Sequence, residues 1–196
     1  MSVVLVDSGG ANIGSVRYAL QRLGVEAALT SDAAAIRAAD KVILPGVGAA
    51  APAMARLRES SLIDVLRGLT QPVLGVCLGM QLLCTHSDEG NVDGLGLIDV
   101  PVRRLDARDG LRVPHMGWNE VTACRDHPLC AGDAGEGWAY FVHSFAVPVC
   151  AATLATCEYG TIFSAAIGQG NFMGVQYHPE RSAALGVAVL QRFLAA

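Results

Sequence analysis

The chain has 196 residues, of which 52% are hydrophobic and 16% are charged, so it carries enough apolar side chains for one well-packed core. Its formal net charge of −4 argues against a nucleic-acid-binding protein, which would normally carry a basic face. No stretch approaches the ~20 uninterrupted apolar residues of a membrane span, and the first residues do not read as a signal peptide, so we expect neither. We therefore expect one cytoplasmic domain over residues 1–196, with its six cysteines reduced.

Strands and helices are predicted to alternate in the first half of the chain. Short β-rich runs end at turn residues, and the segments between them carry apolar residues at helical spacing. The predicted order is strand 3–6, helix 13–23, strand 27–29, helix 32–39, strand 42–44, helical segment 50–69 and strand 72–76. This alternation is typical of a parallel sheet with helices on its faces.

The second half of the chain has a different pattern. Short apolar runs, separated by Gly, Pro, Asn and Asp, predict strands near 139–142, 152–156, 163–167 and 172–177. Some of these strands are expected to be antiparallel and added to one edge or face of the sheet. Apolar residues between Leu185 and Leu194 then recur at helical spacing and predict an amphipathic C-terminal helix. The expected fold is therefore a single mostly parallel α/β domain.

The first stretch that indicates chemistry is GVCLG, residues 75–79, where a strand is predicted to give way to a helix. It is the cysteine version of the nucleophile elbow, in which small neighbours allow a sharp turn that lifts the nucleophile above the sheet. The start of the following helix favours a thiolate at Cys77, and the Leu78 N–H could donate to an oxyanion. A buried structural cysteine is an equally good interpretation of these five residues alone.

The second stretch is QYHPE, residues 176–180. On an extended backbone the side chains of His178 and Glu180 point to the same face, so the carboxylate could orient the imidazole. An incidental surface His-Pro-Glu is the alternative. A cysteine, a base and an acid, each on the expected local structure, together favour a catalytic triad.

The third stretch is PGVG, residues 45–48, directly after the strand predicted to end at Leu44. Two glycines around one residue can present or rotate a backbone N–H group. Ligand sites in open α/β sheets lie at such strand ends. Taken alone, however, the stretch reads as an ordinary turn.

Together, GVCLGMQLL, QYHPE and PGVG resemble the class I (triad) glutamine amidotransferases. PHMGWNE at 114–120 is similar to the branch of this family that works with a cyclase, and YFVHS at 140–144 and Gly-Ala-Asn at 10–12 support this similarity. The resemblance covers essentially the whole chain. It implies a flavodoxin-like, doubly wound, mostly parallel sheet with added antiparallel strands.

The resemblance also implies roles for individual residues. Cys77 would attack the side-chain amide of glutamine, His178 would transfer the proton to the departing ammonia, and Glu180 would orient His178. The backbone N–H groups of Val47 and Leu78 would form the oxyanion hole. The residues implied to bind glutamine are Gly48, Gln81, His143 and Ser144. No cofactor and no metal are implied.

The resemblance further implies a heterodimer in which ammonia passes to a (β/α)8-barrel cyclase subunit that serves histidine biosynthesis. The implied interface residues are Asn12, His115, Trp118, Asn119 and Arg181. Two departures from the family pattern occur here. Ser8 stands where the family usually has Tyr, and Arg181 stands where Lys is common, which keeps the charge with a different geometry.

Other interpretations stay open at this point. The chain could serve another triad amidotransferase, for anthranilate, guanylate or pyridoxal phosphate synthesis, or be a non-catalytic glutamine-binding scaffold; a free cysteine hydrolase is a weaker option. Cys124, His127 and Cys130 offer three metal ligands, but with no obvious fourth we do not expect a metal. Cys84 is expected to be buried on the helix that follows Cys77, and residues 86–90 are expected to form a solvated loop.

Overall fold

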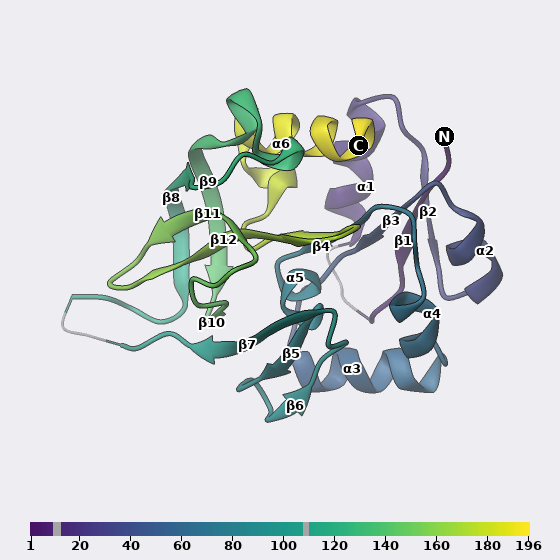
Figure 1. Ribbon diagram of the computed structural model, residues 1–196, viewed down its shortest axis with the longest axis horizontal. Coiled ribbons are helices and arrows are strands. Elements are labelled where there is room, and N and C mark those ends of the chain that lie inside the picture. The colour runs from purple at the N-terminus through teal and green to yellow at the C-terminus, as the bar shows by residue number, and fades with distance from the viewer. Residues whose placement is uncertain (10–12, 108–109) are drawn as a thin grey trace.

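A nine-stranded sheet forms the centre of the protein, whose computed structural model describes residues 1–9, 13–107 and 110–196 (Figure 1). Five neighbouring strands are parallel and have the order of a flavodoxin-like, doubly wound sheet. In spatial order they are β2 (Ala27–Thr30), β1 (Val3–Val6), β3 (Lys41–Leu44), β4 (Val73–Val76) and β13 (Phe172–Val175). The predicted fold class is therefore confirmed.

Four antiparallel strands extend this sheet beyond β13, at one edge, as the sequence pattern indicated. They are β12 (Ile162–Gln169), β11 (Thr153–Glu158), β8 (His115–Ala123) and β9 (Glu136–His143). The shared direction of the first five strands and the long hairpin of β8 and β9 give the sheet two distinct halves. The active-site candidates lie where these halves meet.

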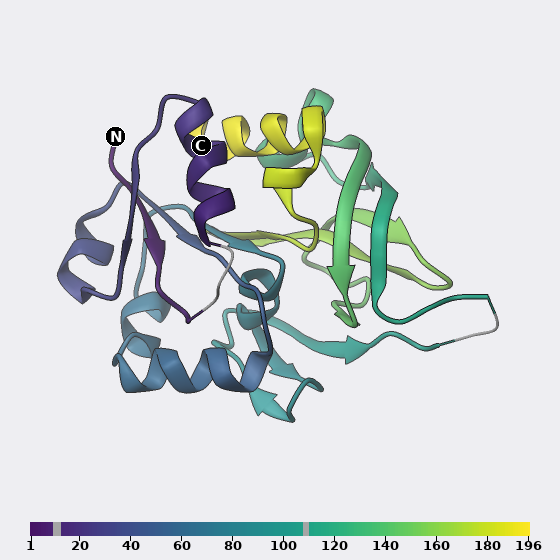
Figure 2. The same ribbon diagram turned by 180° about the vertical axis from the view of Figure 1, so that it is seen from behind.

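Helices cover both faces of the parallel half (Figure 2). Successive strand residues point to opposite faces, so Leu5 packs into the cluster that contains Leu20 and Val189, whereas Val4 packs into the cluster that contains Met54. The first cluster includes residues of α1 (Ile13–Arg22) and α6 (Ala183–Ala195). The second includes residues of α2 (Ala33–Ala38), α3 (Ala50–Glu59) and α4 (Ile63–Arg67). Within the described residues, no helix has the length and apolar character needed to cross a membrane.

Local signals explain where several helices begin and end. Asp32 caps α2, because its Oδ1 accepts a hydrogen bond of 2.8 Å from the Ala34 N–H. The predicted helical segment 50–69 is two helices, since the chain breaks at Ser61, whose φ is +55°. Among the described residues, three short 3-10 helices add single helical turns, at Pro128–Cys130, Gly132–Ala134 and Pro179–Arg181.

A second, four-stranded sheet was not predicted from the sequence. Its strands, in spatial order, are β10 (Phe145–Ala146), β7 (Ile98–Arg104), β5 (Cys84–Ser87) and β6 (Val92–Asp93). The predicted helical position of Cys84 is wrong, because α5 (Leu78–Leu82) ends before it and Cys84 starts β5. The prediction that Cys84 is buried is confirmed. Phe145 brings this small sheet next to the main one.

Two buried histidines face each other across β8 and β9, where His115 pairs with His143. His143 Nδ1 lies 2.8 Å from the Phe145 carbonyl oxygen, which can only accept, so this nitrogen carries the proton. His143 Nε2 is then the acceptor for the His115 Nδ1–H at 3.0 Å. Burial lowers the pKa of His115 to about 4 and that of His143 to about 3. Both rings are therefore neutral in the folded protein near pH 7.

This neutral pair predicts that the protein loses stability in mild acid. Below about pH 6.5 these histidines become protonated in the unfolded chain, whereas in the folded protein they stay neutral until the pH approaches about 4. The unfolded state therefore binds more protons, and the free energy of unfolding falls as the pH falls. Between pH 6 and pH 5 we expect a loss of about 1 kcal/mol per pH unit for each histidine. Urea unfolding across this range measures the slope.

A matched pair of variants separates this effect from other titrations. His115→Gln cannot titrate, so the slope between pH 6 and pH 5 should become clearly shallower. Ser164→Ala removes a fully buried polar side chain on β12 that does not titrate, and should leave the slope unchanged. An identical slope for the wild type and His115→Gln would show that the buried pair does not titrate as described.

Candidate active site

Cys77 occupies a sharp turn between β4 and α5, as the sequence predicted. Its φ of +52° and ψ of −112° lie outside the regions that residues with a side chain ordinarily adopt. Such a conformation costs about 1–3 kcal/mol and persists only when the surrounding structure holds it in place. The turn puts the sulfur at the carboxyl end of the parallel strands, where α/β sheets bind their ligands.

Three glycines make this turn possible by letting α5 approach the sheet backbone. A Cβ atom at Gly79 would overlap the Leu44 carbonyl oxygen, and one at Gly46 would overlap the Gly79 amide nitrogen. A Cβ at Gly75 would lie 2.6 Å from the Gly79 carbonyl carbon. The loop at 46–48 and the start of α5 are therefore in direct backbone contact. The glycines of both motifs are needed so that α5 can pack this closely against the loop and the strand ends.

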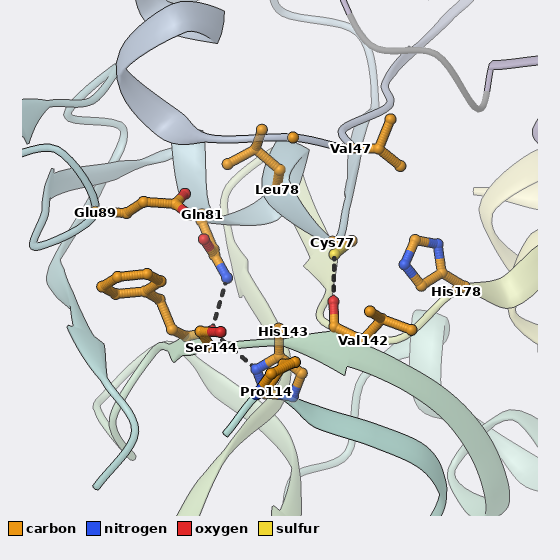
Figure 3. Close-up of a pocket in the computed structure, with 12 residues that line it drawn as sticks. Val47, Cys77, Leu78, Gln81, Glu89, Pro114, Val142, His143, Ser144 and His178 are labelled. Atoms are coloured by element: carbon orange, nitrogen blue, oxygen red, sulfur yellow. Dashed lines mark hydrogen bonds between the residues drawn. The ribbon is translucent and has the colours of Figure 1, made fainter. Parts of the chain in front are cut away.

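His178 and Glu180 form a close pair beside Cys77. The His178 Nδ1 and the Glu180 Oε1 are 2.9 Å apart, and the two side chains are 7% and 1% exposed. The extended backbone predicted for this segment is wrong, because Pro179–Arg181 is a 3-10 turn, although the predicted contact is present. Figure 3 shows the His178 ring on the same side of the pocket as the Cys77 sulfur.

The environment of His178 raises the pKa of its imidazole above the ordinary value. Burial acts in the opposite direction and is the largest single influence, but the neighbouring Cys77 sulfur and the hydrogen-bonded Glu180 carboxylate, with the charges of both groups, outweigh it. His178 is therefore a strong proton acceptor, whereas His143 stays neutral. The contrast makes His178, rather than His143, the candidate base of the site.

The backbone of His178 is fixed by the edge of the main sheet. The His178 N–H donates to the Tyr140 carbonyl at 2.9 Å, and the Ser182 hydroxyl donates to the His178 carbonyl at 2.7 Å. The same hydroxyl oxygen accepts from the Tyr140 N–H at 3.0 Å. These bonds attach the catalytic segment to β9, which ends the sheet on this side.

A pocket of about 310 Å³ opens in front of Cys77 and His178 (Figure 3). It gathers residues from the 46–48 loop, the elbow and the end of β9, which are far apart in the sequence. It contains the predicted oxyanion-hole residues and all four residues that were predicted to bind glutamine. Its lining residues are Val47, Gly48, Cys77, Leu78, Gln81, Glu89, Pro114, Val142, His143, Ser144, Phe145 and His178.

Two of the predicted glutamine-binding side chains are already engaged inside the protein. The Gln81 Nε2 donates to the Phe145 carbonyl at 2.8 Å and to the Gln176 Oε1 at 2.9 Å, which uses both of its protons. His143 donates to the same Phe145 carbonyl. These side chains therefore hold the backbone of the pocket wall at 143–145, and only the Gln81 Oε1 is left to meet a ligand.

Glu89 belongs to the pocket and was missed by the sequence analysis. The predicted solvated loop is wrong at this position, because Glu89 is half-buried and its Oε2 accepts a hydrogen bond of 2.8 Å from the Ala50 N–H. Ala49, at the start of α3, has no side chain that could cap the helix. An uncapped helix directly after the PGVG loop was the available signal that a distant acceptor was needed.

Three of the residues predicted to contact a partner lie at or near the surface. Trp118 is 50% exposed, and Arg181 is exposed with its guanidinium 5.9 Å from the Tyr140 ring. Trp118 contacts the same Tyr140 ring edge-on, so these three side chains form one surface group. Asn119 is half-buried and donates to the Glu158 carbonyl at 2.8 Å.

His115, which was also predicted to contact a partner, does not lie on a docking surface. It is 2% exposed and stacks against Phe141 and Tyr159 at 4.9 and 4.0 Å between ring centres. The prediction was wrong because it grouped His115 with Trp118 and Asn119, whereas on β8 the His115 side chain points into the protein and that of Trp118 points outward. Asn12, the remaining predicted partner residue, lies outside the described residues.

The cysteine-rich loop at 124–130 does not assemble a metal site in the part of the chain that the structure describes, where no three His, Cys, Asp or Glu side chains cluster around a common point. Cys124 is exposed and Cys130 is buried. His127 caps the 3-10 helix Pro128–Cys130, since its Nδ1 accepts from the Leu129 N–H at 3.1 Å.

Comparisons with solved structures agree with this fold. The chain superposes on a crystal structure described as a glutamine amidotransferase with a TM-score of 0.76 and 20% identity, covering 99% of this chain and 98% of the other. A putative GMP synthase component from Thermoplasma acidophilum gives a TM-score of 0.76 at 18% identity, with 100% and 92% of the two chains covered. At these identities the likeness concerns the fold.

Sequence comparisons are more specific. The chain is 53% identical over 192 residues to the imidazole glycerol phosphate synthase subunit HisH of Xanthomonas axonopodis pv. citri, covering 98% of this chain and 96% of the relative. It is 54% identical over 195 residues to the subunit of the same name from Idiomarina loihiensis, covering 99% and 97%. The model of the family described as "Glutamine amidotransferase class-I" matches residues 4–196. This chain belongs to the class I glutamine amidotransferase family.

Proposed function

We propose that the chain is the glutaminase subunit of imidazole glycerol phosphate synthase, a single-domain cytoplasmic protein that releases ammonia from glutamine for a cyclase subunit. The observation that carries the proposal is the Cys77–His178–Glu180 constellation at one pocket, in a chain 53% identical to subunits of that name. The elbow supplies a nucleophile, the pair supplies an oriented base, and the pocket is large enough for an amino acid.

The reaction follows from these positions. Cys77 Sγ attacks the carbonyl carbon of the glutamine side-chain amide, and His178 takes the thiol proton and gives it to the departing ammonia. Water, deprotonated by His178, then hydrolyses the γ-glutamyl thioester to glutamate and regenerates the thiol. The N–H groups of Leu78 and Val47 would stabilise the tetrahedral oxyanion, each donor being worth about 3–4 kcal/mol in other enzymes.

Glu89 is proposed to recognise the amino-acid end of glutamine. One of its carboxylate oxygens holds the Ala50 N–H, so the other is available to the α-ammonium group in the pocket. Gly48, Gln81 and Ser144 line the same cavity and would contact the remaining polar groups of the substrate. Gln81 and His143 act mainly by fixing the pocket wall.

The surface group of Trp118, Tyr140 and Arg181 is proposed to contact the cyclase, which would be a (β/α)8 barrel in a heterodimer with this chain. It lies on β8, β9 and the turn after His178, so a partner seated there would touch the strand that leads into the pocket wall and the turn next to the proposed base. The exposed Met116 adds apolar area, being 67% exposed. An exposed aromatic and arginine group is typical of the energetic centre of an interface.

Removal of the nucleophile tests the division of labour between the two proteins. Cys77→Ala in the complex should abolish synthesis from glutamine, with a loss of at least about 1,000-fold in glutamate release, because no thioester can form. Synthesis from added ammonium salts should continue at the wild-type rate. Both rates are measured in one assay of product formation from the ribonucleotide substrate.

Cys124→Ala is the matched control, since Cys124 is an exposed cysteine away from the pocket and should retain both activities. Loss of the ammonium-dependent rate in Cys77→Ala would contradict the division of labour between the two proteins. Undiminished glutamine-dependent synthesis in that variant would contradict the assignment of the nucleophile.

The two glycines of the 46–48 loop would allow the Val47 N–H to rotate into the pocket when the partner and its substrate bind. We therefore expect the isolated chain to be a poor glutaminase and its partner to raise the rate by orders of magnitude. Gly48 has a φ of +103°, and a side chain there would meet none of the described atoms within 4 Å, so a substitution acts on backbone conformation rather than on packing. Gly48→Val should therefore lower the stimulated rate of glutamate release by about tenfold or more.

The measurement is glutamate release by the chain alone and then in the presence of the cyclase with its ribonucleotide substrate. Gly24→Val is the control, because Gly24 has a φ of +77° and the same free space but follows α1, away from the pocket. Full stimulation in Gly48→Val would exclude loop rotation as the basis of activation. Steady hydrolysis without any stimulation would point to a free glutaminase or to a different synthase partner.

A further inference from the structure

Gln176 lies behind the nucleophile and has no part in the reaction described so far. It follows β13 and precedes His178 by two residues, and it is completely buried. Its side-chain amide makes two contacts: the Oε1 accepts from the Gln81 Nε2 at 2.9 Å, and the Nε2 lies 3.7 Å from the Cys77 sulfur. It does not line the pocket, so it would not touch the substrate.

The orientation of this amide follows from one backbone carbonyl. The Phe145 carbonyl oxygen can only accept, so the NH2 end of Gln81 must face it, at 2.8 Å. The second proton of that NH2 group is then directed at Gln176, which must present its oxygen. The NH2 end of Gln176 consequently points at Cys77. A reversed Gln176 would put two donors against each other in a buried site.

The sulfur therefore has contacts that favour opposite protonation states. The Val142 carbonyl, 3.8 Å from the Cys77 Sγ, can only accept and favours the thiol. The NH2 group of Gln176 can only donate, and it favours the thiolate, because a hydrogen bond to the charged form stabilises that form. When the proton leaves for His178, the contact with Val142 is lost, whereas the contact with Gln176 becomes stronger.

We propose that Gln176 stabilises the Cys77 thiolate and fixes the direction of its sulfur, so that it contributes to nucleophilic attack without touching the substrate. The proposal rests on the proposed function in that Cys77 is taken as the nucleophile. It deepens that function by explaining the buried Gln81–Gln176 pair. Through Gln81, the Phe145 carbonyl in the pocket wall orients the Gln176 amide so that its NH2 group faces the sulfur.

Two variants of Gln176 test this role. Gln176→Met keeps much of the volume but has no N–H to donate, and Gln176→Glu keeps the shape while replacing the donor by an acceptor. The readout is the rate of Cys77 alkylation by iodoacetamide as a function of pH, resolved for each cysteine by mass spectrometry. We expect the midpoint of that profile to move up by about one pH unit in Gln176→Met and further in Gln176→Glu.

Glutamine hydrolysis is the second readout. The loss of one hydrogen bond to a charged sulfur predicts a fall in kcat of about tenfold in Gln176→Met, with a smaller change in KM. A merely structural role would lower stability without moving the pH midpoint. Ser164→Ala is the matched control, because it also removes a fully buried hydrogen-bonding side chain, on β12, and should leave the Cys77 profile unchanged.

The outcomes for the inference and for the proposed function are distinguishable. An unshifted Cys77 midpoint in both Gln176 variants, with folding shown by circular dichroism, overturns the inference even if the wild type hydrolyses glutamine. A shifted Cys77 midpoint in the Gln176 variants, together with a wild type that releases no glutamate even with the cyclase and its substrate, supports the inference and removes the proposed function. Alkylation of the exposed Cys124 in the same samples serves as the internal reference and should not change.

Discussion

The left-handed backbone of Cys77 is the constraint on which the rest of the site depends. A residue with a side chain adopts this conformation only because α5 is held against β3 and β4 on both sides of the turn. Burial of apolar side chains stabilises this position of α5, since Leu78, Met80 and Leu82 are almost completely removed from solvent. The glycines at 46, 75 and 79 permit the approach, and the apolar side chains of α5 stabilise it.

The second organising feature is the Phe145 carbonyl, a single acceptor that sets the polarity of the groups around it. Gln81 and His143 both donate to it, which fixes the orientation of one amide and the tautomer of one imidazole. Burial keeps His143 neutral in spite of its bond to this carbonyl, while His178 is paired with a buried carboxylate and is the proposed base. Two histidines close to one pocket thus differ in function because one faces a neutral ring and the other a negative charge.

The sequence predicted the parallel half of the fold and the contact within the triad because both are encoded locally. Alternating strands and helices specify the first half, and His178 and Glu180 are two residues apart. The small sheet was missed because β5 and β6 are short and mixed in polarity, with no period to recognise. Glu89 and the burial of His115 depend on partners distant in the chain, Ala50 in one case and Tyr159 in the other.

The attachment of His178 to β9 also bears on the tendency of the protein to self-associate. An outermost strand offers unpaired N–H and C=O groups to other molecules, and here the Tyr140 groups are occupied by the backbone of His178 and the hydroxyl of Ser182. The segment that carries His178, the proposed base, also covers a strand that could otherwise pair with a second chain. Damage that releases this segment would expose the Tyr140 N–H and C=O groups as a template for self-association.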